Sequence, residues 1–173
     1  MSSSTPARLF RLVCGGEIER SLRGILAVTL ISTTAFAALW SYVGIWGVTH
    51  LHASQSAVGV MYVLDAIGAA LSGYFGGRLS DRLGRRLVIA AAWGTEALAA
   101  LALAGVGHRI LLGFALVILA GTASGPGFAA TNAIVADLVP ETERESAYAA
   151  MRVATNLGFV TGPPLGGLLL IGT

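Results

Sequence analysis

The ten residues GRLSDRLGRR, Gly77 to Arg86, concentrate five charges in a chain that is otherwise strongly apolar. The runs on either side of them, residues 55–76 and 87–106, contain one acidic residue each and no basic residue. About 20 apolar residues are enough for a helix to cross the hydrocarbon core of a bilayer. The ten residues therefore predict a short charged connection between two membrane crossings.

The composition of the whole chain also indicates a membrane protein. Of the 173 residues, 55% are hydrophobic and 12% are charged, whereas soluble domains carry about 25% charged residues. All 11 basic residues are arginines, and the formal net charge is only +2, which is too small to indicate a nucleic-acid partner. We therefore expect an all-α membrane protein whose surroundings are the lipid bilayer, with no nucleic acid among its partners.

Five apolar stretches are long enough to form crossings. The polar segment before them, residues 1–21, predicts a cytoplasmic N-terminal tail, and residues 22–173 predict a partial transmembrane bundle. Pro126 lies within the fourth stretch and favours a bend there. The five expected helices cover about residues 22–47, 55–77, 87–106, 110–136 and 145–171.

The arginines predict the orientation of these crossings. In the five-helix arrangement, ten of the 11 arginines fall on one side of the membrane, and Arg109 falls on the other. Positively charged residues accumulate on the cytoplasmic side of membrane proteins. We therefore expect a multi-pass plasma-membrane protein with its N-terminus in the cytoplasm.

The spacing within the charged connection, G-x3-D-R-x-G-R-R, carries more information than its charge. Gly77 permits close contact between helices, Gly84 permits a tight turn, and Asp81 offers a carboxylate beside several arginines. A simple positive anchor at the inner membrane surface would need neither the aspartate nor the two spaced glycines. The pattern resembles the signature loop of the major facilitator superfamily.

This resemblance implies a fold and a role for the loop. Superfamily members have two bundles of six helices, so the chain would be an incomplete N-terminal bundle: a fragment, a truncated product or half of a split transporter. The loop would act as a latch, in which Asp81 meets a helix end of the second bundle and stabilises one access state. Arg82, Arg85 and Arg86 would share that role. The second bundle would lie beyond residue 173, in the same or another chain.

A second pattern, G-x3-G-P-x2-G-G, lies in the fifth apolar stretch. Glycines at four-residue spacing make a flat helix face, and a proline bends the helix. The pattern resembles the antiporter motif on helix five of superfamily exporters, and residues 137–156 resemble the connection before it in bacterial drug exporters. It implies a bent, water-excluding seam where two bundles close on each other. Its residues are Gly158, Gly162, Pro163, Gly166 and Gly167.

Two acidic residues, Asp65 and Glu96, fall near the middle of predicted crossings. A charge at that depth costs about 3 kcal/mol or more. Each acid is therefore either a proton or substrate site or a neutral acid that is hydrogen-bonded between helices. Superfamily members commonly carry an arginine in helix four, and Val117 stands at the matching position, so one part of the usual proton relay is missing. Asn132 and Asn156 either line a substrate path or join helices by hydrogen bonds.

Together these features predict a secondary active transporter that exports a small lipophilic or cationic compound in exchange for protons. The alternative is a non-transporting membrane scaffold or regulatory subunit that packs against another membrane protein. An enzyme is not expected, because no crossing presents a nucleophile with a base or a phosphate-binding loop. Neither a metal site nor a cofactor is expected, because His50, His52 and His108 have no cysteine or carboxylate at binding spacing.

Overall fold

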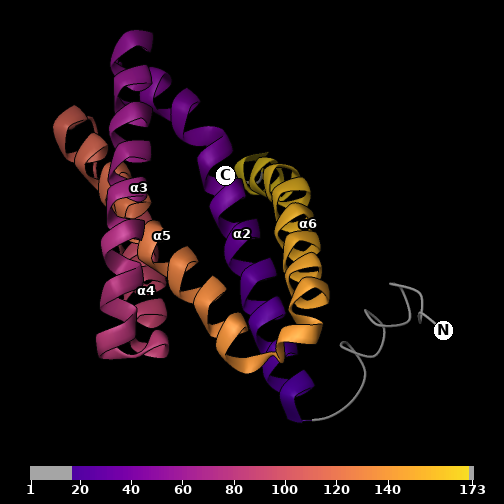
Figure 1. Ribbon diagram of the computed structural model, residues 1–173. Coiled ribbons are helices and arrows are strands. Elements are labelled where there is room, and N and C mark those ends of the chain that lie inside the picture. The colour runs from indigo at the N-terminus through magenta and orange to yellow at the C-terminus, as the bar shows by residue number, and fades with distance from the viewer. Residues whose placement is uncertain (1–16, 172–173) are drawn as a thin grey trace. The chain divides into compact units, whose positions relative to one another are not determined.

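The computed structural model describes residues 17–171, and this range is helical apart from short connections (Figure 1). No strand occurs within it, which confirms the all-α fold. Most of the predicted N-terminal tail lies outside the described residues, and the first described helix begins at Glu17. The elements are α2 (Glu17–Thr49), α3 (Gln55–Leu83), α4 (Arg85–Leu103), α5 (Ile110–Leu138), the short 3-10 helix η1 (Glu141–Glu143) and α6 (Arg144–Ile171).

The charged connection differs from its prediction. Helix α3 continues past Gly77 to its end, and α4 begins directly after Gly84, so that a single residue separates the two helices. Gly84 has φ 93°, a conformation that residues with a Cβ rarely adopt, and its N–H donates to the Ser80 carbonyl at 3.1 Å. The expected loop over residues 78–86 is therefore wrong. Its arginines, leucines and serine are compatible with a helix, and only Gly84 interrupts the helical path.

Four helices are long and apolar enough to cross a membrane, by length and composition alone: residues 21–49 of α2, and α3, α4 and α5. The predicted fifth crossing is also a helix, α6. Helix α6 contains two adjacent prolines, Pro163 and Pro164, within its length.

The chain divides into two compact units. Unit 1 comprises Met1–Ser41 and Ile134–Thr173, and unit 2 comprises Tyr42–Ala133. Helices α2 and α5 each contribute residues to both units. Asp65 and Glu96 both belong to unit 2. So does the charged segment 77–86 at the junction of α3 and α4, which we call the hinge.

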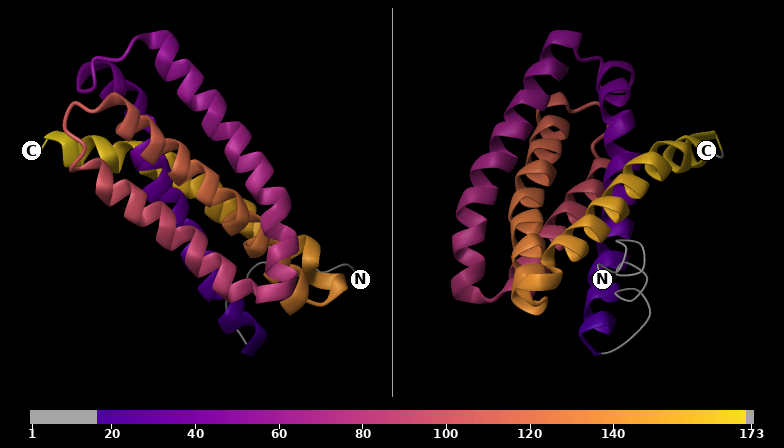
Figure 2. Two further views of the ribbon diagram at one scale, coloured as in Figure 1. Left: turned by 90° about the vertical axis from the view of Figure 1, so that its left-hand side faces the viewer. Right: turned by 45° about the vertical axis from the view of Figure 1, so that its right-hand side comes forward.

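In unit 2, α3 and α5 approach each other closely enough to require glycine. A Cβ on Gly68 would collide with the Thr122 side chain, and a Cβ on Gly76 would collide with Pro126. Residue numbers rise together along the two helices in these contacts, so α3 and α5 run parallel (Figure 2). Small residues at such crossings let two backbones pack directly against each other.

Pro126 removes one hydrogen bond from α5 without ending the helix. Because proline has no N–H, the carbonyl oxygen four residues earlier, that of Thr122, loses its helical donor. The Ser72 hydroxyl of α3 donates to this oxygen at 2.6 Å. The contact between α3 and α5 therefore satisfies a backbone group that would otherwise lie unpaired in an apolar interior.

In unit 1, α2 and α6 make a second crossing lined by glycine. A Cβ on Gly158 would collide with the Thr33 side chain, and a Cβ on Gly162 would lie 2.7 Å from the Thr34 carbonyl oxygen. The hydroxyl oxygens of Thr34 and Thr161 are 3.3 Å apart across this contact. The core of unit 1 is a buried apolar cluster of Leu22, Val135, Val139, Ala147 and Met151.

Candidate functional site

The hinge between α3 and α4 is organised by Arg85. Its Nη1 atom lies 2.5 Å from Asp81 Oδ1 and donates to Ser80 Oγ at 2.7 Å. The Ser80 hydroxyl, which is only 2% exposed, donates in turn to the Gly77 carbonyl at 2.7 Å. The Asp81 side chain remains 59% exposed. Asp81 is therefore oriented by an ion pair and is still accessible to a further partner.

The other arginines of this segment lie on its surface. Arg78, Arg82 and Arg86 are exposed, and the Arg78 guanidinium carbon lies 4.8 Å from the centre of the Tyr74 ring. This distance is typical of a cation–π contact. Of the four predicted latch residues, the structure brings Asp81 and Arg85 together, whereas Arg82 and Arg86 extend from exposed positions.

The two predicted membrane acids are buried. Asp65 on α3 is 7% exposed and Glu96 on α4 is 9% exposed. Within the described chain, neither Asp65 Oδ1 nor Glu96 Oε2 has a hydrogen-bond partner. A Cβ on Gly121 of α5 would collide with the Asp65 carboxylate, so this glycine makes room for the acid. Buried polar atoms without partners are rare in native proteins and require an explanation such as a water, an ion or a functional role.

Asp65 and Glu96 lie at different depths. Counted from Gly84 at 1.5 Å per residue, Asp65 lies about 28 Å along α3 and Glu96 about 18 Å along α4. The axial positions of the two residues therefore differ by about 10 Å. They therefore form two acidic positions at successive heights along the helices.

A family comparison identifies the kind of membrane protein that carries these acids. Residues 25–173 match the Major Facilitator Superfamily. The chain belongs to this superfamily. The predicted family is thus confirmed, and together with the long apolar helices it makes the chain a multi-pass membrane protein.

Three relatives show how much of a facilitator protein is present. The chain is 26% identical over 155 residues to the Na(+), Li(+), K(+)/H(+) antiporter of Planococcus maritimus, and 30% identical over 119 residues to Multidrug resistance protein 2 of Bacillus subtilis (strain 168). It is 25% identical over 114 residues to Quinolone resistance protein NorA of Staphylococcus aureus. These alignments cover 87%, 69% and 66% of the chain, but only 36%, 30% and 29% of the relatives. The chain thus spans about a third of the length of these relatives.

The antiporter-type motif of this facilitator chain lies on α6. Gly158 and Gly162 face α2 within unit 1. A seam between two bundles at this motif stays a prediction. Gly166 is buried, and Pro163 and Gly167 are half-buried. Helix α6 curves over its last turns (Figure 1), as expected where adjacent prolines remove backbone hydrogen bonds.

The two predicted asparagines lie at exposed positions. Asn132 Nδ2 donates to the Phe128 carbonyl of its own helix at 2.9 Å. Asn156 lies on α6 in unit 1. Val117, where the superfamily commonly has an arginine, is completely buried. A role for either asparagine in a substrate path stays a prediction.

The sequence did not reveal a histidine cluster that joins two connections of unit 2. His108 Nδ1 lies 2.8 Å from the His50 carbonyl oxygen, and the ring centre of His108 lies 4.9 Å from that of His50 and 5.7 Å from that of His52. The three rings tie the α2–α3 connection to the α4–α5 connection. Among the described residues no three potential ligands form a metal site, so we interpret the cluster as structural. The short spacing of His50 and His52 was the one indication of this cluster in the sequence, because His108 lies 56 residues after His52.

Proposed function

We propose that the chain is the N-terminal part of a secondary active transporter that exports a small lipophilic or cationic compound in exchange for protons. The observation that carries this proposal is the presence of two buried acids with unpaired oxygens, Asp65 and Glu96, in a facilitator superfamily chain. Ionisable residues inside a membrane typically mark ion pathways and proton relays. A carrier, rather than an enzyme, fits this arrangement.

The names of the relatives support both sides of the exchange. One is called an antiporter of monovalent cations and protons, and two are named for resistance to drugs or quinolones. A carboxylate that loses its proton gains a charge that attracts a cation. Release of the proton would therefore let the same acid bind a cationic substrate. Binding of a proton would then release that substrate.

The proposed path has two acidic stations and a hinge. Glu96 lies nearer to Gly84 than Asp65 does, so a proton or cation would meet the two acids in succession. The hinge would serve as the latch, in which Asp81 leaves Arg85 for a helix end of the second bundle, with Arg82 and Arg86 close by. That second bundle would be supplied by the same or another chain.

We propose a plasma-membrane location with the N-terminus and the hinge in the cytoplasm. In a background in which Cys14 is replaced by serine, Arg86→Cys and Arg109→Cys place one thiol at each end of unit 2. A membrane-impermeant maleimide added to intact cells should label Arg109→Cys and should leave Arg86→Cys unlabelled. External labelling of Arg86→Cys would overturn both the orientation and the role of the hinge.

The transport proposal is tested by reconstituting the full-length product in liposomes that contain a pH-sensitive dye. Adding Na⁺, a quinolone or the lipophilic cation ethidium should drive proton movement. Asp65→Asn and Glu96→Gln should each abolish this coupling, whereas Glu141→Gln, which changes an exposed acid of η1, should retain it. Correctly folded protein that moves protons with none of these compounds would favour the scaffold. Unchanged pH dependence in both acid variants would remove Asp65 and Glu96 from the mechanism.

A further inference from the structure

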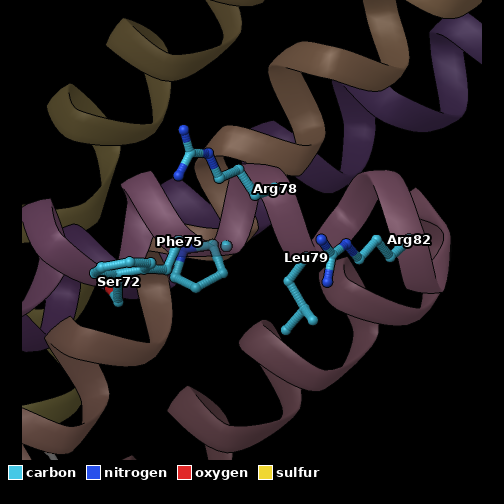
Figure 3. A pocket seen from close by; sticks show the side chains of 7 residues that line it. Ser72, Phe75, Arg78, Leu79 and Arg82 are labelled. Atoms are coloured by element: carbon cyan, nitrogen blue, oxygen red, sulfur yellow. The ribbon is translucent and has the colours of Figure 1, made fainter.

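We propose that the end of α3 in unit 2 binds the headgroup of one anionic phospholipid, with its phosphate held by Arg78 and Arg82. This proposal does not rest on proton exchange, because it uses neither buried acid. A hollow of about 460 Å³ lies at this place, between α3 and Pro126 of α5. Its volume falls in the range of small-molecule sites, about 300–1,000 Å³. Ser72, Phe75 and Leu79 line it together with the two arginines (Figure 3).

The length of α3 places the hollow at the membrane boundary. The helix has 29 residues, or about 44 Å at 1.5 Å per residue, whereas the hydrocarbon core is about 30 Å thick. Measured from the middle of α3, Arg78 lies about 14 Å away and Arg82 about 20 Å away. Arg78 therefore reaches the edge of the hydrocarbon core, and Arg82 lies in the headgroup layer.

The charge of the hollow suits a phosphate. Arg78 and Arg82 are four residues apart and so share one face of α3. Neither residue's charge is offset by an acid among the residues that line the hollow. The nearby Asp81 is already engaged by Arg85. Arginine presents several N–H donors in a planar fork and binds phosphate oxygens through two of them at once.

The apolar part of the hollow suits an acyl chain. Phe75 is 62% exposed and Leu79 is 48% exposed. Figure 3 shows the Arg82 side chain extending beside Leu79, so that charge and apolar surface adjoin. A soluble phosphate would cover the arginines and leave the apolar side chains bare. A phospholipid covers both, with its headgroup on the arginines and its chains on Phe75 and Leu79.

The test is to count and rank bound lipids by native mass spectrometry of the complete chain, released from detergent micelles. Phosphatidylglycerol and phosphatidylcholine with identical acyl chains are titrated separately. One phosphatidylglycerol should bind more tightly than any phosphatidylcholine. Arg78→Gln and Arg82→Gln should each weaken that binding about 5-fold, and the double variant about 30-fold. Arg86→Gln, which changes an exposed arginine at the same end that does not line the hollow, should leave it unchanged.

Three outcomes would overturn the proposal. Equal binding of the two lipids would exclude a headgroup site, and an equal loss in Arg86→Gln would show a general effect of positive charge. If soluble glycerol phosphate displaced the bound lipid as effectively as free phosphatidylglycerol does, the apolar side chains Phe75 and Leu79 would have no role in binding. The double variant Arg78→Lys/Arg82→Lys keeps both charges but loses the planar forks, so it should bind more tightly than the double glutamine variant, and misfolding of the glutamine variants then cannot mimic a lost site. Repeating the titration on the full-length product must also show the bound lipid, because its absence there would mean that a protein segment fills the hollow.

Discussion

Replacing Gly125 by alanine should force α3 and α5 apart and destabilise unit 2. The added Cβ would collide with the Ala69 carbonyl oxygen, and it would lie 2.5 Å from Ser72 Oγ and 2.8 Å from Gly73 N. Two of these three atoms belong to the backbone, so no change of rotamer can relieve the overlap. Elsewhere inside a helix the same substitution stabilises by up to about 1 kcal/mol. A net loss of stability would therefore report the close approach of the two helices.

The size of the loss follows from the contacts involved. Adding a methyl group to a tightly packed site costs about 1–3 kcal/mol. Moving the helices apart would also stretch the bond from Ser72 to the Thr122 carbonyl, and such a bond contributes about 0.5–1.5 kcal/mol. We expect the free energy of unfolding to fall by about 3 kcal/mol. The unfolding midpoint should then drop by about 6–12 °C, on the scale of domains of this size.

The assay is thermal unfolding of the purified chain in detergent, followed by far-ultraviolet circular dichroism. Gly59→Ala is the matched control, because nothing lies within 4 Å of its added Cβ. Gly73→Ala is a graded control, because its nearest neighbour, the Gly125 carbonyl oxygen, lies at an ordinary 3.4 Å. Both controls should melt at or above the wild-type temperature. If Gly125→Ala melts together with them, the glycine crossing of α3 and α5 is refuted.

The remaining predictions use the same unfolding measurement. Ser72→Ala should cost about 1–2 kcal/mol, because it leaves the Thr122 carbonyl unpaired, whereas Ser32→Ala removes a bond within a single helix and should cost less. Equal costs would argue that the Ser72 hydroxyl does not replace the hydrogen bond that Pro126 removes from the Thr122 carbonyl. Arg85→Gln should cost about 1–2 kcal/mol and speed hydrogen exchange at the Gly84 amide, because it releases both Asp81 and Ser80. Unchanged exchange would contradict that role. Gly158→Ala should destabilise unit 1 by about 1–3 kcal/mol through Thr33, while Gly24→Ala, with nothing within 4 Å, should not; identical melting of this pair would rule out the close crossing of α2 and α6.

The positions of the helices could be predicted from the sequence because a bilayer imposes a length on each apolar run. The hinge could not be placed by the same reasoning. Gly77 and Gly84 look equivalent in the pattern, yet only Gly84 has a positive φ, and Gly77 continues α3. Helix α3 continues through Gly76, which packs against Pro126 of α5, and this contact joins residues about 50 positions apart that the pattern of the charged segment does not include.

The candidate acids could also be predicted, because charges at membrane depth are rare. Their surroundings could not. A helix that is apolar on all sides does not reveal which face meets a neighbour, so neither the contact of Gly121 with Asp65 nor that of Ser72 with the Thr122 carbonyl could be predicted. The same limit concealed the contact of His108 with His50.

The hydrogen bonds at the hinge give Asp81 an arrangement that a latch requires. A latch residue must be oriented before its partner arrives and must leave its first contact at little cost. Asp81 is more than half exposed, and an ion pair at such a surface contributes only about 0–1 kcal/mol. Arg85 is held independently by the buried Ser80 hydroxyl, so it keeps one acceptor when Asp81 departs. In the proposed latch, exchange of Asp81 between Arg85 and a second partner would therefore leave Arg85 with its Ser80 acceptor and would cost about 0–1 kcal/mol for the lost ion pair.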